Sequence, residues 1–188
     1  AVKPRLRTFA IAQLVNRLQR FEKTVLNGIR RQFRVSQPLP GKEQTNKEGV
    51  LATVVYKTLD GKTLNPATLA QGTDFKAVVT ITGTADKYKL HDMALTQIFP
   101  SCWEIINTRL LELDDVSASS AAQYQDFRDD RVYTYFDFSN AGSRVYEVRL
   151  NATYVGKYYL PAPKVEAMYY PSVRYNGQGQ WVEVVLQK

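Results

Sequence analysis

Apolar and polar residues alternate along much of the chain after Gly28, and the alternation is clearest in residues 145–155. One set of side chains in this segment is apolar or aromatic and comprises Tyr146, Val148, Leu150, Ala152 and Tyr154. The residues between them are Glu147, Arg149, Asn151 and Thr153. Because successive side chains of a β-strand point to opposite faces, we expect the first set to lie in a core and the second in solvent.

Similar patterns predict further short strands, which we place at residues 50–58, 75–82, 93–100, 103–106, 131–138 and 182–186. Turn residues separate these segments, as at Asp60-Gly61 and Asn65-Pro66. Residues 113–123 have few apolar anchors and no clear period, so we expect an exposed crossing connection there. About eight to ten short strands, punctuated by Gly, Pro, Asn and Asp, favour an all-β fold built as an antiparallel two-sheet sandwich.

The beginning of the chain has a different period. Apolar residues spaced three or four apart are Leu6, Phe9, Ala10, Leu14, Leu18, Phe21 and Val25. This spacing predicts an amphipathic helix that stops near Asn27-Gly28. We therefore divide the chain into a basic helical segment, residues 1–27, and a β-sandwich domain, residues 28–188. The helix is expected to pack on its own or a neighbouring domain; the alternative is binding to a membrane or to nucleic acid.

The formal net charge of +7 is unevenly distributed along the chain. Residues 1–34 hold nine basic residues and one acidic residue, whereas the remainder holds sixteen basic and seventeen acidic residues. The sandwich should therefore present a nearly neutral surface, and we expect no nucleic-acid partner for it. No run approaches the roughly 20 apolar residues that span a bilayer, so no membrane insertion by this segment is expected. The N-terminus also lacks the apolar core of a secretory signal.

Residues suited to catalysis or metal binding are scarce. The single histidine, His91, and the single cysteine, Cys102, could form a dyad only if the fold brought them together. We favour a strand-edge histidine and a half-buried thiol over a dyad, and we expect no enzymatic activity. Asp126, Asp129 and Asp130 could supply oxygen ligands to calcium, but arginines are interleaved with them, which favours an ion-paired turn. We expect neither a cofactor nor a metal site.

Two groups of residues remain as candidates for recognition. The run Arg128-Asp129-Asp130-Arg131 indicates either a surface salt-bridge turn or an arginine clamp on nearby backbone or another domain. The second group is aromatic and consists of Tyr154, Tyr158, Tyr159, Tyr169, Tyr170 and Tyr175. These tyrosines could build a carbohydrate-stacking platform, but a sandwich core and a domain interface also require aromatic residues. We favour places in the core and at a domain interface over a platform.

Three segments carry a resemblance to a known family. They are the runs Tyr124-Gln125-Asp126-Phe127-Arg128-Asp129-Asp130-Arg131-Val132-Tyr133, Glu166-Ala167-Met168-Tyr169-Tyr170 and Ile98-Phe99-Pro100-Ser101-Cys102-Trp103-Glu104-Ile105-Ile106-Asn107. Over residues 28–186 the chain resembles the C-terminal β-sandwich domain of bacterial α2-macroglobulin-like proteins. The resemblance implies a sandwich of macroglobulin or fibronectin-like type. It departs from the family at Cys102, where the family typically has Gly, which raises the question of a positive φ at this position.

The resemblance also implies a function. Members of the family trap proteases and can carry a thioester in a helical domain, but the thioester sequence Cys-Leu-Glu-Gln is not in this chain. The domain is thus expected to be noncatalytic, to pack on or shield the thioester domain of a periplasmic or cell-envelope parent, and to meet target proteases only through that parent. The interface candidates are Arg128, Asp129, Asp130, Arg131, Tyr169 and Tyr170. The alternative is an independent β-sandwich module that binds carbohydrate or an envelope protein.

Overall fold

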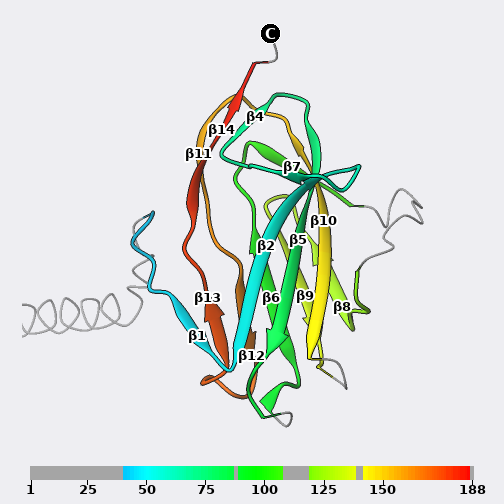
Figure 1. Ribbon diagram of the computed structural model, residues 1–188, viewed down its shortest axis with the longest axis vertical. Helices are drawn as coiled ribbons and strands as arrows, with labels where there is room; N and C mark the ends of the chain where they lie inside the picture. Colours follow the sequence, from blue (N-terminus) through cyan, green and yellow to red (C-terminus); the bar gives the residue numbers. More distant parts are fainter. Residues whose placement is uncertain (1–39, 87–88, 108–118, 139–141, 187–188) are drawn as a thin grey trace, which may run out of the picture. The chain divides into compact units, whose positions relative to one another are not determined.

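The computed structural model describes residues 40–86, 89–107, 119–138 and 142–186 (Figure 1). They lie in one compact unit, Pro38–Lys188. Within these residues the structure has fourteen strands and no α-helix, so the all-β expectation is confirmed. The expected helical segment, residues 1–27, and the start of the sandwich domain at residue 28 lie outside the described residues. No helix in the described part of the chain is long and apolar enough to span a bilayer.

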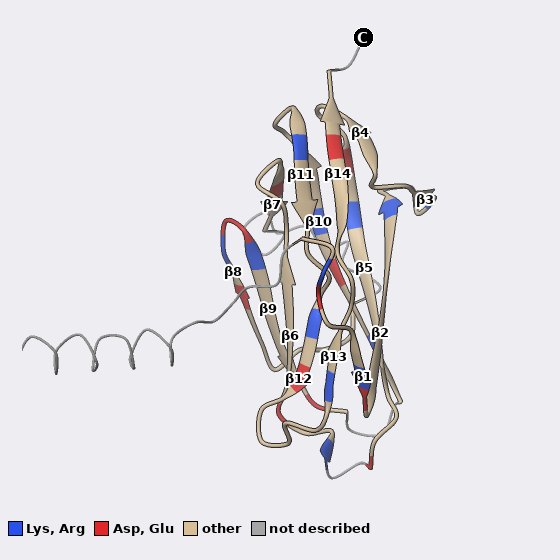
Figure 2. Ribbon diagram, turned by 90° about the vertical axis from the view of Figure 1, so that its left-hand side faces the viewer, with Lys and Arg blue, Asp and Glu red and all other residues tan. Residues whose placement is uncertain are grey.

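Six strands form one antiparallel sheet. In spatial order they are β1 (Asn46–Glu48), β13 (Arg174–Asn176), β12 (Lys164–Ala167), β6 (Met93–Ile98), β9 (Arg131–Phe136) and β8 (Tyr124–Phe127). Strand β6 lies in the interior of this sheet because it pairs with β12 on one side and with β9 on the other. Figure 2 shows this sheet beside the second sheet described below, with the β8–β9 hairpin at the edge of the first sheet.

The second sheet is also antiparallel and contains five strands. Its order is β3 (Thr63–Leu64), β2 (Val50–Thr58), β5 (Asp74–Gly83), β10 (Ser143–Ala152) and β7 (Trp103–Ile106). The view in Figure 1 places β2, β5 and β10 in front and β6 and β9 behind them. A third sheet of three strands was not expected from the sequence. It joins β11 (Gly156–Leu160), β14 (Gln180–Val185) and β4 (Thr68–Ala70), and its β14–β4 pair is parallel.

The predicted alternation accounts for the core. In β10 the side chains of Tyr146, Val148, Leu150 and Ala152 are buried, as expected. Tyr154 is not: it follows the last residue of β10, 54% of it is exposed, and its hydroxyl donates to Glu104 Oε1 at 3.2 Å. The assignment of Tyr154 to the core was therefore wrong, because the strand ends before the alternation does.

The buried side chains form two clusters. Met93 and Leu95 from β6 meet Phe136 from β9 and Tyr146 from β10 in the first cluster. The second includes Trp103, whose ring meets Phe75 edge-on at a centroid distance of 5.0 Å. Aromatic pairs prefer such tilted contacts, and each buries a large apolar area. The two inner faces of the sandwich are thus held together by side chains from strands distant in sequence.

The connections also match their residues. Asp60-Gly61 makes the expected turn, with Gly61 at φ 87° and its N–H donating to Thr58 O at 3.0 Å. The described end of the crossing connection, residues 119–123, is not simply exposed. Ser120 N donates to Val145 O at 2.7 Å, and the Ser119 and Ser120 hydroxyls accept from Glu147 N and Val145 N. This connection therefore covers part of the β10 edge.

Replacing Phe136 with alanine tests the importance of the first cluster. Phe136→Ala removes a fully buried ring from the contact between the two sheets, so we expect the free energy of unfolding in urea to fall by about 3–5 kcal/mol. Tyr154→Ala is the matched control, and its cost should stay within about 1 kcal/mol because the ring is exposed. Equal losses in the two variants would contradict the described core.

Candidate functional site

The loop between β12 and β13 displays an exposed apolar cluster. Met168, Tyr169 and Tyr170, here called the apolar loop, are 52%, 73% and 38% exposed. The base of the loop is closed by two backbone hydrogen bonds, from Ala167 N to Val173 O at 3.0 Å and from Val173 N to Tyr170 O at 2.8 Å. Ala167 and Val173 are themselves buried in the first core cluster. The loop therefore presents large side chains to solvent from an anchored backbone, as interaction surfaces do.

A strained residue supports the apolar loop from behind. Asp92 has φ 51°, the only positive φ among the described non-glycine residues, and its carbonyl accepts a hydrogen bond from Met168 N at 3.0 Å. Its own N–H donates to Asp137 Oδ1 at 2.7 Å. Gln123 Nε2 donates to the other oxygen of Asp137 at 2.6 Å. Asp137 thus fixes the left-handed conformation of Asp92, and Asp92 in turn binds the backbone of the apolar loop. Backbone strain persists where several surrounding interactions fix the conformation in this way.

The charged run lies in the turn of the β8–β9 hairpin, which Figure 2 shows with both signs of charge. Arg131 makes a forked contact with the carboxylate of Asp130, at 2.8 and 2.6 Å, and its Nη1 lies 3.3 Å from the Tyr133 hydroxyl. Arg128 Nε donates to Asp126 Oδ2 at 2.8 Å. The hydrogen bond from Arg131 lowers the pKa of Asp130, while the hydrogen bonds to Asp130 and to Tyr133 raise the pKa of Arg131. The ion-paired turn is therefore confirmed, and the guanidinium group of Arg131 binds the carboxylate of the adjacent Asp130.

The two sets of interface candidates do not form one surface. Arg131 pairs with Ile98 at one end of β6, whereas Ala167, just before the apolar loop, pairs with Met93 at the other. At about 3.3 Å per residue the two ends of β6 lie on the order of 17 Å apart. Arg128, Asp129, Asp130 and Arg131 are therefore near one end of the sandwich, and Tyr169 and Tyr170 near the opposite end. Their roles at interfaces remain predictions.

The same geometry separates the only histidine from the only cysteine. His91 precedes β6 and Cys102 follows it, so the strand lies between them and they cannot form a dyad. Cys102 is fully buried, burial raises the pKa of its thiol to about 11, and its φ is not positive. In the described residues no three His, Cys, Asp or Glu side chains cluster as metal ligands would. Cysteine therefore replaces the expected glycine without backbone strain.

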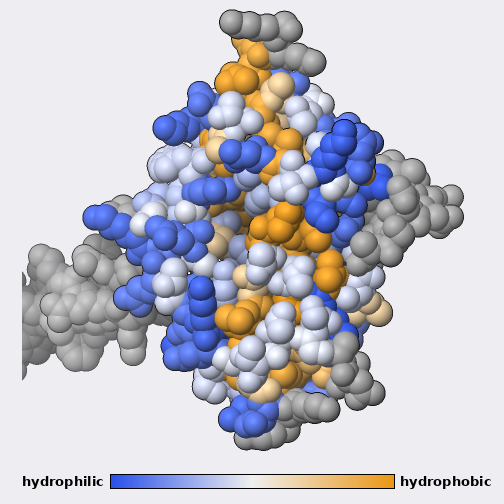
Figure 3. Space-filling view, viewed as in Figure 1, coloured by the Kyte–Doolittle hydropathy of each residue, from blue (hydrophilic) through white to orange (hydrophobic). Residues whose placement is uncertain are grey.

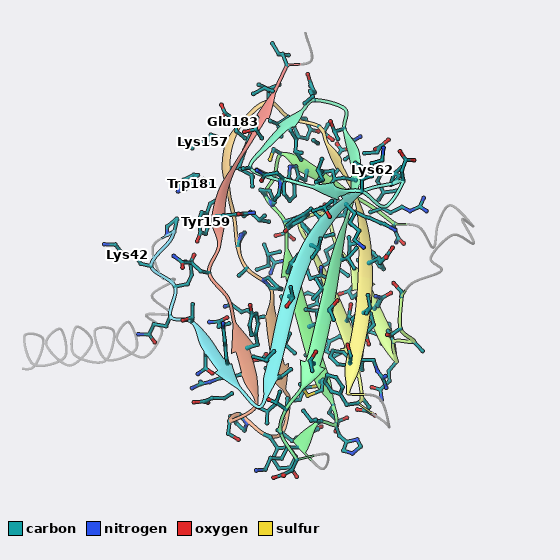
Figure 4. All side chains as sticks on the ribbon, viewed as in Figure 1. Lys42, Lys62, Lys157, Tyr159, Trp181 and Glu183 are labelled. Atoms are coloured by element: carbon teal, nitrogen blue, oxygen red, sulfur yellow. The ribbon has the colours of Figure 1, made fainter. Side chains whose placement is uncertain are left out.

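A second aromatic surface lies on the outer side of β11 and β14, where Figure 4 shows Tyr159, Trp181 and Lys157 side by side. The Tyr159 and Trp181 rings meet edge-on at 5.4 Å, and Lys157 Nζ lies 5.8 Å from the centroid of Trp181. The Tyr159 hydroxyl bonds Glu43 and accepts from Gly41 N, and the bond from Tyr159 lowers the pKa of Glu43. Trp181 is half exposed.

The tyrosines named as a possible platform are dispersed over the domain. Tyr159 joins Trp181 on the β11–β14 surface, Tyr169 and Tyr170 lie on the apolar loop, and Tyr158 and Tyr175 pack against the two core clusters. Sequence reasoning missed Trp181, although the alternation of Val182 and Val184 places it on the outer face. It also missed Asp92, for which Asp before a strand is only a weak signal of a left-handed conformation.

Comparison with known proteins agrees with this architecture. Residues 49–172 match the family described as the bacterial alpha-2-macroglobulin MG10 domain. The chain belongs to this family. An alpha-2-macroglobulin of Xylella fastidiosa is 28% identical over 136 residues, which cover 65% of this chain and 8% of that protein. One of Pasteurella multocida is 24% identical over 135 residues, covering 72% of this chain and 7% of the relative. The MG10 domain thus spans less than a tenth of these relatives.

Solved structures show the same fold. A crystal structure of native Escherichia coli alpha-2-macroglobulin, spanning domain MG7 to the C-terminus, superposes with a TM-score of 0.66 at 18% identity, over 76% of this chain and 24% of that one. A Salmonella alpha-2-macroglobulin mutant gives a TM-score of 0.65 at 20% identity, over 76% of this chain and 10% of that one. The expected macroglobulin-type sandwich is therefore confirmed.

Substitution of Asp137 tests the support of the apolar loop. Asp137→Ala removes the acceptor for Asp92 N–H, so we expect the loop to open more often and chymotrypsin to cut after Tyr169 several-fold faster, as measured by mass spectrometry. The stability of the domain should fall by about 1–3 kcal/mol, the usual cost of losing hydrogen bonds to a charged group. Asp137→Asn retains one acceptor oxygen and should lie closer to the unaltered chain. Arg131→Ala, at the opposite end of β6, should leave cleavage after Tyr169 unchanged. Faster cleavage after Tyr169 in this variant would contradict the proposal that Asp137 supports the loop locally.

Alkylation of Cys102 tests its burial. Because burial raises the pKa of the thiol from 9.0 to about 11, little thiolate is present near neutral pH, and iodoacetamide should label the folded chain at least tenfold more slowly than the urea-unfolded chain. The unfolded state ionises at the lower pKa, so this thiol's contribution to stability is complete below about pH 9 and is lost as the pH rises toward 11. Rapid labelling of the folded chain at pH 7 would show that the thiol is accessible.

Proposed function

We propose that this chain is the noncatalytic C-terminal interaction domain of a bacterial alpha-2-macroglobulin that traps proteases. Its apolar loop packs on, or shields, the thioester domain of the parent polypeptide. The observation that carries this proposal is the exposure of Met168, Tyr169 and Tyr170 on a loop anchored to the core. Tyrosine and methionine are enriched at protein interfaces because they offer large, partly apolar contact areas.

The absence of a catalytic role is supported by the chemistry of Cys102. Its thiol is buried and separated from His91 by the length of β6, so no base of that kind activates it. The chain also lacks the Cys-Leu-Glu-Gln sequence of a thioester. Target proteases would accordingly be recognised by other parts of the parent, which we place in the periplasm or cell envelope.

The β8–β9 turn is proposed as a contact with a different domain of the parent. Arg128, Asp129, Asp130 and Arg131 lie at the far end of β6 from the apolar loop, so one small partner surface cannot cover both. Exposed ion pairs of this kind contribute little affinity but can select the orientation of a partner.

The second candidate function is that of an independent module that binds carbohydrate or an envelope protein. The observation that favours it is the half-exposed Trp181 beside Tyr159, because sugar rings stack on exposed aromatic rings. This surface is distinct from the apolar loop, so substitutions can separate the two candidates.

Binding to the thioester-type helical domain of the same parent tests the first candidate. Tyr169→Ala and Met168→Ala each remove an exposed side chain of the apolar loop, and each should weaken the measured Kd at least tenfold, the equivalent of about 1.4 kcal/mol. Trp181→Ala is the matched aromatic control and should leave this Kd unchanged. If both loop variants bind as tightly as the unaltered chain, the loop is not the contact. Loss of binding in Trp181→Ala alone would favour the second surface.

A further inference from the structure

Among the residues that the structure describes, one edge of β2 has no partner strand over most of its length. Strand β2 pairs with β5 along all nine of its residues, but on its other side it pairs with β3 only at Tyr56 and Lys57. The register of β3 would next place Pro66 opposite Val54. Proline has no N–H to donate, so β3 stops there. Among the described residues, no strand pairs with this side of Ala52 or Val54.

The direction of the unpaired groups follows from the ladder. Thr84 N donates to Gly49 O at 2.9 Å, so odd-numbered residues of β2 exchange hydrogen bonds with β5. Thr58 N donates to Lys62 O at 2.8 Å, so even-numbered residues face the other edge. The N–H and C=O groups of Ala52 and Val54 therefore point outward along the sheet.

This edge also lacks the protection that exposed edges usually carry. The segment Val50-Leu51-Ala52-Thr53-Val54-Val55-Tyr56 contains no charge and no proline, and most of its residues have high β-propensity. The outermost strands of the six-stranded sheet differ, because β1 carries Lys47 and Glu48 and β8 carries Asp126. An open, uncharged edge of this kind favours pairing with a further strand.

A hollow runs beside the same edge. It has a volume of about 300 Å³ and is lined on one side by Ala52, Val54 and Tyr56 of β2 and on the other by residues 160–163 and 178–180. Pro161 and Pro163 on the far wall have no N–H groups, so they cannot donate hydrogen bonds to the carbonyl groups of β2. Figure 3 shows the face that carries β2, where apolar side chains gather in a band along the middle.

We propose that the β2 edge is a strand-addition site, filled by an extended, uncharged strand of the longer alpha-2-macroglobulin polypeptide outside this chain. The strand runs antiparallel to β2, in line with β3, and exchanges hydrogen bonds with Ala52 and Val54. We assign the added strand to the longer polypeptide because this chain corresponds to 8% or less of the length of its curated relatives. Continuity with β3 fixes its direction, and the missing charge along the edge selects small or β-branched residues.

Hydrogen exchange resolved to single amides tests the proposal on the protein itself. In the isolated chain the amides of Ala52 and Val54 should exchange at least a hundredfold faster than those of Thr53 and Val55, which bond β5. In the full-length parent the Ala52 and Val54 amides should become protected by a similar factor. Unchanged exchange in the parent would overturn the proposal. Protection that grows with the concentration of the isolated chain would assign the edge to a second copy instead, and would also overturn it.

A peptide probe tests the strand chemistry independently of the parent. A seven-residue peptide of alternating Thr and Val should slow exchange at Ala52 and Val54, whereas the same peptide with alternate amides N-methylated should not. Val54→Pro removes an outward N–H without removing a bond to β5, and should abolish the effect; Val54→Ala keeps the N–H and should retain it. The methylated peptide keeps the test decisive if Val54→Pro does not fold. Equal effects of the two peptides would overturn strand addition.

None of these outcomes depends on the apolar loop. Tyr169→Ala should leave exchange at the β2 edge unchanged, and Val54→Pro should leave binding to the thioester domain unchanged. Failure of the loop experiment would therefore not contradict strand addition, and failure at the edge would not contradict the proposed function.

Discussion

The pairing of β6 with both β9 and β12 is the constraint on which the rest of the domain depends. It places Met93 and Leu95 in the first core cluster, against residues of the opposite sheet. The same pairing fixes the β8–β9 turn at one end of the strand and the apolar loop at the other. Because the register of a strand cannot slip by one residue without exposing its buried face, the positions of both surfaces are set by the core.

The strands with clear alternation could be predicted from sequence, and those without it could not. Strands β2 and β7 begin and end at the expected residues because they are rich in β-branched or aromatic residues and are bounded by turn residues. Strand β6 begins at the expected Met93. Strands β11, β12 and β13 span five, four and three residues and are separated by proline-bearing segments, so their periods are too short to identify them. The parallel β14–β4 pair joins segments more than a hundred residues apart, and a local pattern contains no information about such a pairing.

The candidate site shows a similar division. The ion pairs of the β8–β9 turn were predictable because each arginine is within two residues of its acid partner. The support of the apolar loop was not, since Asp92, Asp137 and Gln123 come from three separate segments. Tyr154 shows the opposite failure: alternation continues in the sequence after β10 has ended at Ala152.

Some groups on the surface of the domain already bind neighbouring residues, whereas other surface groups are exposed to solvent. Arg128 and Arg131 already bind neighbouring carboxylates, and Tyr159 already binds Glu43, so a partner gains little by contacting them. The apolar loop exposes side chains that water solvates poorly, and the β2 edge exposes backbone groups placed to complete a ladder. Burying Met168 and Tyr169 removes apolar surface from water, and a strand added to β2 replaces hydrogen bonds to water with hydrogen bonds of a ladder. Interfaces in a multidomain chain should therefore form at these two places before they form at the more conspicuous charged turn.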